Sequence, residues 1–261
     1  MGKTIAIASR KGGVGKTTTA VNLAVGLARQ GKSVFALDLD PQGSMTVSFG
    51  VKDPEKRKVT VGSVMTDIIN EQEVNLTGGY IRHTEDVYLL PNNNSLSGVE
   101  LLLGQMMMNR ESVLRQYVET VKADYDYIVI DCSPNLGLLT LNALVAADSV
   151  IIPVVPKFLD AKGLESLLKT VAQVKRQLNP KLEIDGILLT MVDRRANFTR
   201  EVISSIENAY GGNIKIFGER IPRSVRVTES SANGVSIFAH DPNGKVSAAY
   251  SAIVEGVLSN D

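Results

Sequence analysis

The residues from Lys11 to Thr18 place three glycines, two lysines and two threonines within eight positions. Gly12, Gly13 and Gly15 give this turn the backbone freedom to aim several N–H groups at one anion. An apolar run before the turn predicts a strand, and a periodic run after it predicts a helix whose N-terminus adds a positive dipole end. The segment therefore predicts a phosphate-binding loop.

The side chains of the loop extend this prediction to a nucleotide. Lys16 is expected to reach the β- and γ-phosphates, and the hydroxyl of Thr17 to bind Mg2+. The strict Walker A pattern fails because Arg10 occupies its first glycine position, whereas Lys11 fits the deviant form. We expect ATP and Mg2+ as cofactors, bound by Lys11, Gly12, Gly13, Val14, Gly15, Lys16, Thr17 and Thr18.

Three aspartates follow apolar runs that are typical of buried strands. Asp38 and Asp40 end one run and Asp131 ends another. Alternate strand residues share a face, and the carboxyl ends of parallel strands meet at one edge, so all three can face the phosphates. A single aspartate in this position could equally be a helix cap or a turn residue. Three beside one phosphate loop favour a magnesium–nucleotide site.

The elements that must hold these residues alternate along the chain. Helical periodicity from Ala20 to Ala28 ends at Gly31, and strands are predicted at residues 3–9, 33–39, 87–90, 127–131, 149–155 and 184–190. We predict an α/β protein with a single-domain P-loop NTPase fold over residues 1–261. Its mostly parallel, twisted sheet is flanked by helices on both faces. No helix-turn-helix module precedes the first strand, and Met106–Met108 are expected in the core or in helix packing.

Composition excludes several classes of protein. The 28 basic and 28 acidic residues cancel, so any binding to nucleic acid must come from a local patch. The single cysteine, Cys132, excludes a disulfide framework and a multi-cysteine zinc site within one chain. No secretory signal is present, and no apolar run reaches the ~18 residues of a membrane span. We expect a cytoplasmic protein without a membrane partner.

Further motifs extend over nearly the whole chain. They are Asp38-Leu-Asp-Pro-Gln-Gly43, Asp131-Cys-Ser-Pro-Asn-Leu-Gly-Leu-Leu139, Asn142-Ala-Leu144, Pro153, Leu189-Thr-Met-Val-Asp193 and Ile221-Pro-Arg-Ser-Val-Arg226. Together with the phosphate loop, these residues resemble the ParA/MinD group of ATPases. The resemblance is closest to its ParA/Soj branch, which partitions chromosomes and plasmids.

This resemblance implies roles for individual residues. Lys11 corresponds to the signature lysine that reaches the partner's phosphates across an ATP-sandwiched homodimer, where it offsets charge on the transferring phosphoryl group. Asp40 corresponds to the residue that positions or activates the attacking water, and the Pro134 region to a switch. The resemblance thus implies catalytic Lys11, Lys16 and Asp40, a magnesium site of Thr17, Asp38 and Asp131, and a base-proximal set of Met191, Pro222 and Arg223.

The same resemblance implies partners. The family binds double-stranded DNA non-specifically and is stimulated by a ParB-type centromere-binding protein; Arg195 and Arg226 match its DNA-binding arginines, implying nucleoid association. From Met191 to Arg226 there are seven basic residues and four acidic ones. Two such patches in a dimer could bind phosphates in a salt-dependent manner. A solvated helix face is the alternative interpretation.

Two alternative functions remain at this point. A MinD-like membrane-positioning ATPase should end in a basic amphipathic helix, whereas Val254–Asp261 carries two acidic residues and no basic one. A nucleotide-regulated scaffold is poorly separated by sequence from a DNA-segregation ATPase. Arg10 and Lys157 also depart from the branch, where glutamine and an acidic residue are more common.

Overall fold

The computed structural model describes residues 2–157, 160–193 and 197–259. Its strands are β1 (Lys3–Ile7), β2 (Val34–Leu39), β3 (Ile81–Arg82), β4 (Val87–Leu90), β5 (Tyr127–Cys132), β6 (Ser149–Val154) and β7 (Glu183–Leu189). Its helices are α1 (Lys16–Arg29), α2 (Ser44–Ser48), the 3-10 turn η1 (Pro54–Lys56), α3 (Val61–Ile69), α4 (Leu96–Gln105), α5 (Val113–Val121), α6 (Leu138–Ala146), α7 (Asp160–Gln177), α8 (Asn197–Tyr210), α9 (Val225–Ala232), α10 (Ile237–His240) and α11 (Lys245–Leu258).

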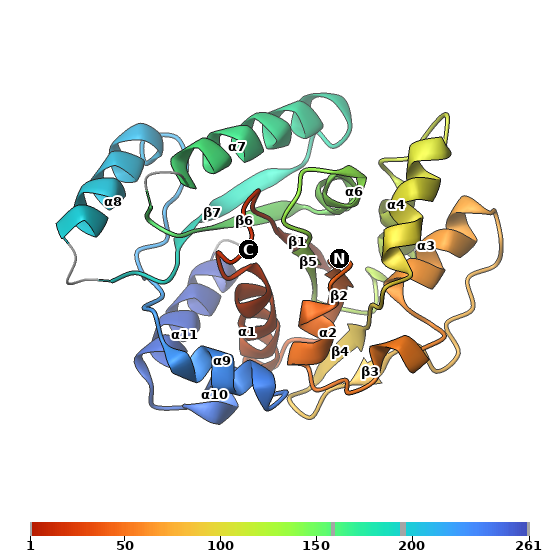
Figure 1. Ribbon diagram of the computed structural model, residues 1–261, viewed down its shortest axis with the longest axis horizontal. Helices are drawn as coiled ribbons and strands as arrows, with labels where there is room; N and C mark the ends of the chain where they lie inside the picture. Colours follow the sequence, from red (N-terminus) through yellow and green to blue (C-terminus); the bar gives the residue numbers. More distant parts are fainter. Residues whose placement is uncertain (1, 158–159, 194–196, 260–261) are drawn as a thin grey trace.

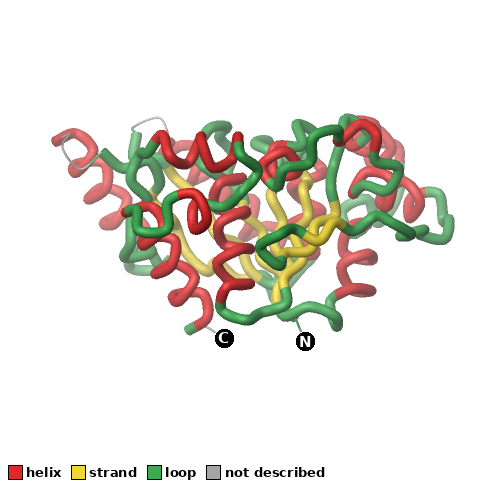
Figure 2. Tube along the Cα trace, turned by 90° about the horizontal axis from the view of Figure 1, so that it is seen from below, coloured by secondary structure: helices red, strands yellow, loops and turns green. Residues whose placement is uncertain are grey.

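The strands form one seven-stranded sheet in the order β3-β4-β2-β5-β1-β6-β7 (Figure 1). All pairings are parallel except that of β3 with β4. Figure 2 shows the strands between layers of helices. The predicted α/β fold class is confirmed. Because β1 has β5 on one side and β6 on the other, the loop that follows β1 lies near the middle of the sheet's carboxyl edge.

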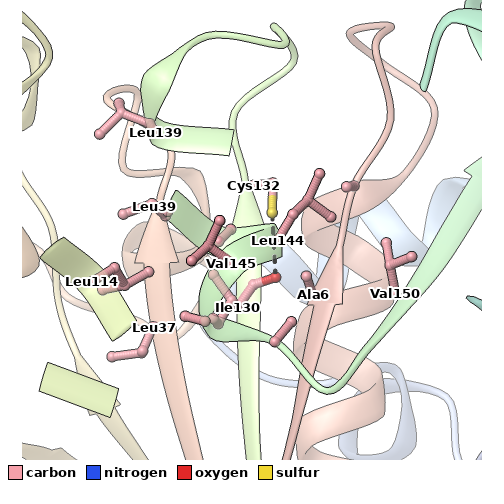
Figure 3. Close-up of a cluster of buried hydrophobic side chains, with 14 of the residues drawn as sticks. Ala6, Leu37, Leu39, Leu114, Ile130, Cys132, Leu139, Leu144, Val145 and Val150 are labelled. Carbon is pink, nitrogen blue, oxygen red and sulfur yellow. Dashed lines mark hydrogen bonds between the residues drawn. The ribbon is translucent and has the colours of Figure 1, made fainter. Parts of the chain in front are cut away.

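Alternation along the strands builds two apolar cores. In β1, Ala6 faces helices α3 to α8, whereas Ile5 and Ile7 face α1, α10 and α11. Figure 3 shows part of the first core, where strand residues Ala6, Leu37, Leu39, Ile130 and Val150 gather with Leu114, Leu139, Leu144 and Val145 from the helices. Both faces of the sheet are therefore covered by helices.

The structure corrects two expectations. All six predicted strands are present, but β3 was not predicted, because its two residues contain no apolar run. Met106–Met108 do not share a core position: α4 ends at Gln105, and the side chains of Met107 and Met108 are 99% and 75% exposed. Only Met106 packs against the core. None of the described helices is long and apolar enough to span a membrane.

Close packing of α1 against α10 and α11 leads to a stability prediction. A Cβ atom at Gly26 would lie 2.5 Å from Val254 Cγ2 and 3.2 Å from Phe238 Cε2, whereas a Cβ at Gly98 in α4 would meet nothing within 4 Å. We expect Gly26→Ala to lower the free energy of unfolding by about 1–3 kcal/mol through overpacking. Gly98→Ala should raise it by about 0.5–1 kcal/mol, because alanine is the better helix former. Urea titrations of both variants that shifted in the same direction would contradict this.

Candidate active site

The glycine-rich loop connects β1 to α1 with the geometry of an anion-binding turn. Gly13 and Gly15 have φ angles of 71° and 85°, the left-handed region that glycine adopts without a steric penalty. Gly15 directly precedes α1, whose N-terminus has no side-chain cap and no acidic residue in its first turn. The first N–H groups of the helix therefore have no intrahelical acceptor and can bind phosphate.

Lys16 is held inside this loop. Its side chain is 6% exposed, and its Nζ donates a hydrogen bond of 3.1 Å to the carbonyl oxygen of Lys11. Burial lowers the pKa of Lys16, and the negative charges of Asp131 and Asp40 oppose this effect. The ammonium group is thus positioned between the loop backbone and the carboxylates at the neighbouring strand ends.

Asp131 connects the loop to β5. Thr17 Oγ1 donates a hydrogen bond of 2.7 Å to Asp131 Oδ2, whereas Asp131 Oδ1 is buried and has no hydrogen-bond partner among the described residues. Asp131 pairs in register with Asp38 of β2, and both are fully buried. Burial and the charge of Asp38 raise the pKa of Asp131 well above its ordinary value. A cation beside this pair would relieve that repulsion.

Asp38 organises the segment that carries Asp40. Asp38 Oδ2 accepts hydrogen bonds from the N–H and the hydroxyl of Thr46 at 2.8 and 2.7 Å, and Oδ1 accepts one from the N–H of Asp40 at 3.3 Å. Asp40 Oδ1 in turn accepts the N–H of Gln42 at 3.1 Å. Burial raises the pKa of Asp38 to about 6. The structure thus shows Asp38 anchoring the loop, and its role as a magnesium ligand stays a prediction.

These residues fit Mg2+ held together with a nucleotide. Among the described residues, no three His, Cys, Asp or Glu side chains converge as a metal-binding group. Mg2+ in nucleotide enzymes keeps several waters and takes its remaining oxygens from phosphates and one or two protein groups, so a separate protein cage is not required. The Thr17 hydroxyl and the unpartnered oxygen of Asp131 are oxygen donors of the required kind.

Helix α7 lies over the leading end of the loop. Arg10 donates a hydrogen bond of 2.7 Å to Ser166 Oγ, and a Cβ at Gly163 would lie 3.5 Å from Lys11 Cγ. On the other side, a Cβ at Gly12 would lie 3.9 Å from that of Pro134. The structure therefore places the predicted signature lysine beside α7 and the predicted switch segment beside the phosphate loop.

A cavity of about 380 Å³ adjoins the loop where α1 begins. Its lining includes the three residues predicted near the base, Met191, Pro222 and Arg223. Met191 adopts a left-handed φ of 51°, and its Cε would lie 3.9 Å from a Cβ at Gly15. The complete lining is Gly15, Thr18, Thr190, Met191, Ile221, Pro222, Arg223, Ser224, Val227, Thr228, Ser231 and Tyr250. Its size and position suit a nucleotide base beside bound phosphates.

Several lining residues were missed from the sequence. Thr190 Oγ1 donates a hydrogen bond of 2.7 Å to the carbonyl of Val14, which fastens the loop to the end of β7. The hydroxyl of Tyr250, from α11, lies 3.2 Å from Thr19 Oγ1. Thr190 belongs to the motif Leu189–Asp193, whereas Tyr250 and the α9 hydroxyl residues Thr228 and Ser231 belong to none of the sequence motifs. Only packing of the last third of the chain against α1 places them here.

The structure describes one of the two predicted DNA-binding arginines. Arg195 lies outside the described residues. Arg226 is exposed near the start of α9 and forms an ion pair of 3.0 Å with Glu229. Lys215, which was counted in the same basic segment, instead lines a separate cavity with Lys3 and Asp185, at the amino ends of the strands. Lys215 therefore lies apart from the base cavity, and the seven basic residues of this segment do not all belong to one surface.

Comparisons with known proteins agree with this geometry. A family model described as an AAA domain matches residues 2–184. The chain is 40% identical over 260 residues to the sporulation initiation inhibitor protein Soj of Bacillus subtilis, covering 100% of both proteins. It is 38% identical over 263 residues to the chromosome partitioning protein ParA of Myxococcus xanthus, covering 100% of this chain and 89% of that protein. The chain belongs to the ParA/Soj family of ATPases.

Solved structures of relatives share the fold. A Mycobacterium smegmatis protein named cobyrinic acid a,c-diamide synthase, crystallised with an ATP analogue and magnesium, has a TM-score of 0.85 and 32% identity, covering 100% of this chain and 96% of that chain. A protein from Borrelia burgdorferi described as a plasmid partition protein, bound to AMPPNP, has a TM-score of 0.79 and 26% identity with complete coverage of both chains. The P-loop ATPase fold is thus confirmed for this member of the ParA/Soj family.

The buried carboxyl of Asp38 makes stability depend on pH. Its folded-state pKa of about 6 exceeds the ordinary 3.8, so it favours the folded state below pH 3.8 and loses this contribution as the pH rises through 6. Asp38→Asn does not ionise. Without nucleotide and magnesium, the free energy of unfolding of the variant should gain about 2–3 kcal/mol relative to the parent between pH 4 and 7. A pH-independent difference in urea titrations would refute this.

Proposed function

We propose that this protein is a Mg-dependent ATPase that partitions chromosome or plasmid DNA. In the ATP-bound state it forms a homodimer that binds double-stranded DNA without sequence specificity, and a ParB-type partner stimulates hydrolysis. The convergence of Lys16, Thr17, Asp131 and Asp40 on one phosphate loop, next to a base-sized cavity, carries the proposal. The 36–40% identity to Soj and ParA proteins over nearly the full length supports it.

Nucleotide binding follows from the geometry. The N–H groups at the start of α1 and the ammonium of Lys16 would hold the phosphates, while the base enters the cavity lined by Met191 and Pro222. Thr17 and Asp131 would hold Mg2+, directly or through water. When bound, Mg2+ would offset the negative charge of the phosphates. Lys16 would offset additional charge as the phosphoryl group transfers.

Hydrolysis is assigned to Asp40. This carboxylate is 8% exposed and is oriented by the N–H of Gln42. Its charge contributes to the pKa shifts of both Lys16 and Asp131, which supports a role for Asp40 beside these two residues. A carboxylate held here can orient a water and accept its proton, which contributes typically 10²–10⁴-fold to a rate.

Dimerisation would use Lys11. In the structure its stem lies beside Gly163 of α7, and Arg10 is fastened to Ser166 of the same helix. For Lys11 to reach the phosphates of a partner, its side chain would have to leave α7. The transition to the dimer would therefore rearrange the leading end of the phosphate loop. Because the nucleotide would bind the same loop, dimer formation would depend on the nucleotide that is bound.

DNA binding would involve the helix that also lines the base cavity. Residues Val227, Thr228 and Ser231 of α9 line that cavity, while Arg226 of the same helix is exposed. Nucleotide binding and dimer formation could therefore place two copies of this arginine on one surface. Non-specific binding to DNA phosphates needs only such an array of cations, and it would associate the protein with the nucleoid in the cytoplasm.

Other functions need different observations. A MinD-like or scaffold-type positioning ATPase would use the same nucleotide cycle without DNA segregation, and DNA binding distinguishes the two. The archaeal MinD from Pyrococcus furiosus is 24% identical, a level at which the likeness shows the fold alone.

Two variants separate nucleotide binding from hydrolysis. Lys16→Ala should weaken ATP binding more than ~10-fold, because it removes the buried cation that meets the phosphates. Asp40→Ala should keep ATP affinity within a few-fold, lose at least ~100-fold in hydrolysis and accumulate as an ATP-bound dimer. Calorimetry, phosphate release and light scattering measure these outcomes. The exposed pair Lys56 and Asp53 provides alanine controls that should behave as the parent. Parental hydrolysis by Asp40→Ala would exclude its assigned role.

Salt dependence tests the DNA assignment. With ATP and Mg2+, Arg226→Ala and Arg195→Ala should each weaken binding to arbitrary duplexes equally for all sequences. Each should also lower the slope of log affinity against log salt by ~1–2 per dimer. Arg115→Ala is the matched control, because Arg115 also forms a local ion pair but lines the cavity at the amino ends of the strands. Fluorescence anisotropy that showed no ATP-dependent DNA binding at low salt would rule out the segregation proposal.

A further inference from the structure

Asn92 is a buried amide at the carboxyl end of β4 that contacts the segment between β2 and α2. It has no exposure to solvent. Its side-chain Nδ2 donates a hydrogen bond of 2.7 Å to the carbonyl oxygen of Asp40, and its backbone N–H donates one of 2.9 Å to Thr46 Oγ1. A Cβ at Gly43 would lie 3.6 Å from the carbonyl oxygen of Asn92. The segment therefore wraps around Asn92 and contacts it near both ends and in the middle.

The second of these contacts continues to Asp38. The hydroxyl of Thr46 accepts the N–H of Asn92 and donates its own proton to Asp38 Oδ2 at 2.7 Å. Asp38 Oδ1 accepts the N–H of Asp40 at 3.3 Å. Asp40 is consequently held on both sides of its Cα atom: Asp38 accepts its N–H, and its C=O accepts hydrogen bonds from the Asn92 amide and, at 2.8 Å, from the N–H of Gly43. Because both adjoining peptide groups are held, the Cα–Cβ bond that carries the carboxylate has a fixed direction.

We infer that Asn92 is a positioning residue for hydrolysis, which acts by holding the backbone of Asp40. A structural explanation alone would favour an apolar side chain at a fully buried strand end, because burying an amide costs free energy unless its groups are paired. Asn92 Oδ1 is buried and lacks a hydrogen-bond partner among the described residues. Among the described residues, the one side-chain hydrogen bond of Asn92 goes to the carbonyl oxygen of Asp40.

The expected effect is specific to turnover. This inference rests on the proposed role of Asp40, and Asn92 is absent from the lining of the base cavity, so nucleotide affinity should not depend on it. Loss of the amide removes one of the two hydrogen bonds that hold the Asp40 carbonyl oxygen and loosens this peptide group, and misplacement of a catalytic group by about 1 Å can cost ~10²-fold in rate. Asn92→Ala should therefore lower kcat by about 10–100-fold and leave KM for ATP within about threefold.

Asn94 provides the matched control, because it is the same residue type two positions later and is exposed. The experiment measures ATP hydrolysis, ATP affinity and Tm for Asn92→Ala and Asn94→Ala in the full chain. Asn94→Ala should match the parent in all three. If Asn92→Ala does not fold, Asn92→Leu keeps a similar size, cannot donate a hydrogen bond and should show the same loss of kcat.

A double variant distinguishes positioning from general support of the fold. Because Asn92 acts through Asp40, adding Asn92→Ala to Asp40→Ala should not slow single-turnover hydrolysis further, whereas a purely structural role would give the same additional loss in both backgrounds. Parental kcat, or an equal loss of ATP affinity, in Asn92→Ala would overturn the inference. If Asp40→Ala itself hydrolyses ATP at the parental rate, the proposed function fails first, so the two failures are distinguishable.

Discussion

Two carboxylates buried side by side are the constraint on which the site depends. Asp38 and Asp131 stand in register on β2 and β5 without solvent exposure, so burial raises the cost of ionising both, and the charge of Asp38 raises it further for Asp131. Hydrogen bonds from Thr46 and Thr17 and the charge of Lys16 offset this cost. Thr17 and Lys16, which follow β1, therefore interact with Asp131 at the end of β5, and the charge of Lys16 also interacts with Asp40 after β2.

The sheet makes this arrangement possible because its strands are parallel and its two faces are apolar. Every strand that carries a site residue ends at the same edge, while the residues below are buried against helices on both sides. Packed cores of this kind resist small displacements, so the loops at the edge start from fixed positions. The left-handed glycines Gly13 and Gly15 then allow the chain to turn tightly and present its N–H groups.

The last third of the chain completes the site from the other side of α1. Tyr250 from α11 and the hydroxyls of α9 close the cavity beside the loop, and Gly26 lets α11 approach α1 closely. Helix α9 carries residues that line the cavity and also carries the exposed Arg226. One short helix therefore lines the cavity and also carries a solvent-exposed basic residue, and the proposed ATP-dependent binding of DNA relies on this arrangement.

The sequence by itself determined the phosphate loop, the six longer strands and the aspartates at their ends, because these follow from contiguous residues: glycine spacing, apolar runs and the polar residue that closes each run. Tertiary structure alone decided the rest. Asn92 and Tyr250 lay in none of the sequence motifs, and Met107 and Met108 were expected in the core or in helix packing but are exposed. Their environments depend on which distant segments pack together, and local patterns of hydrophobicity carry no information about such contacts.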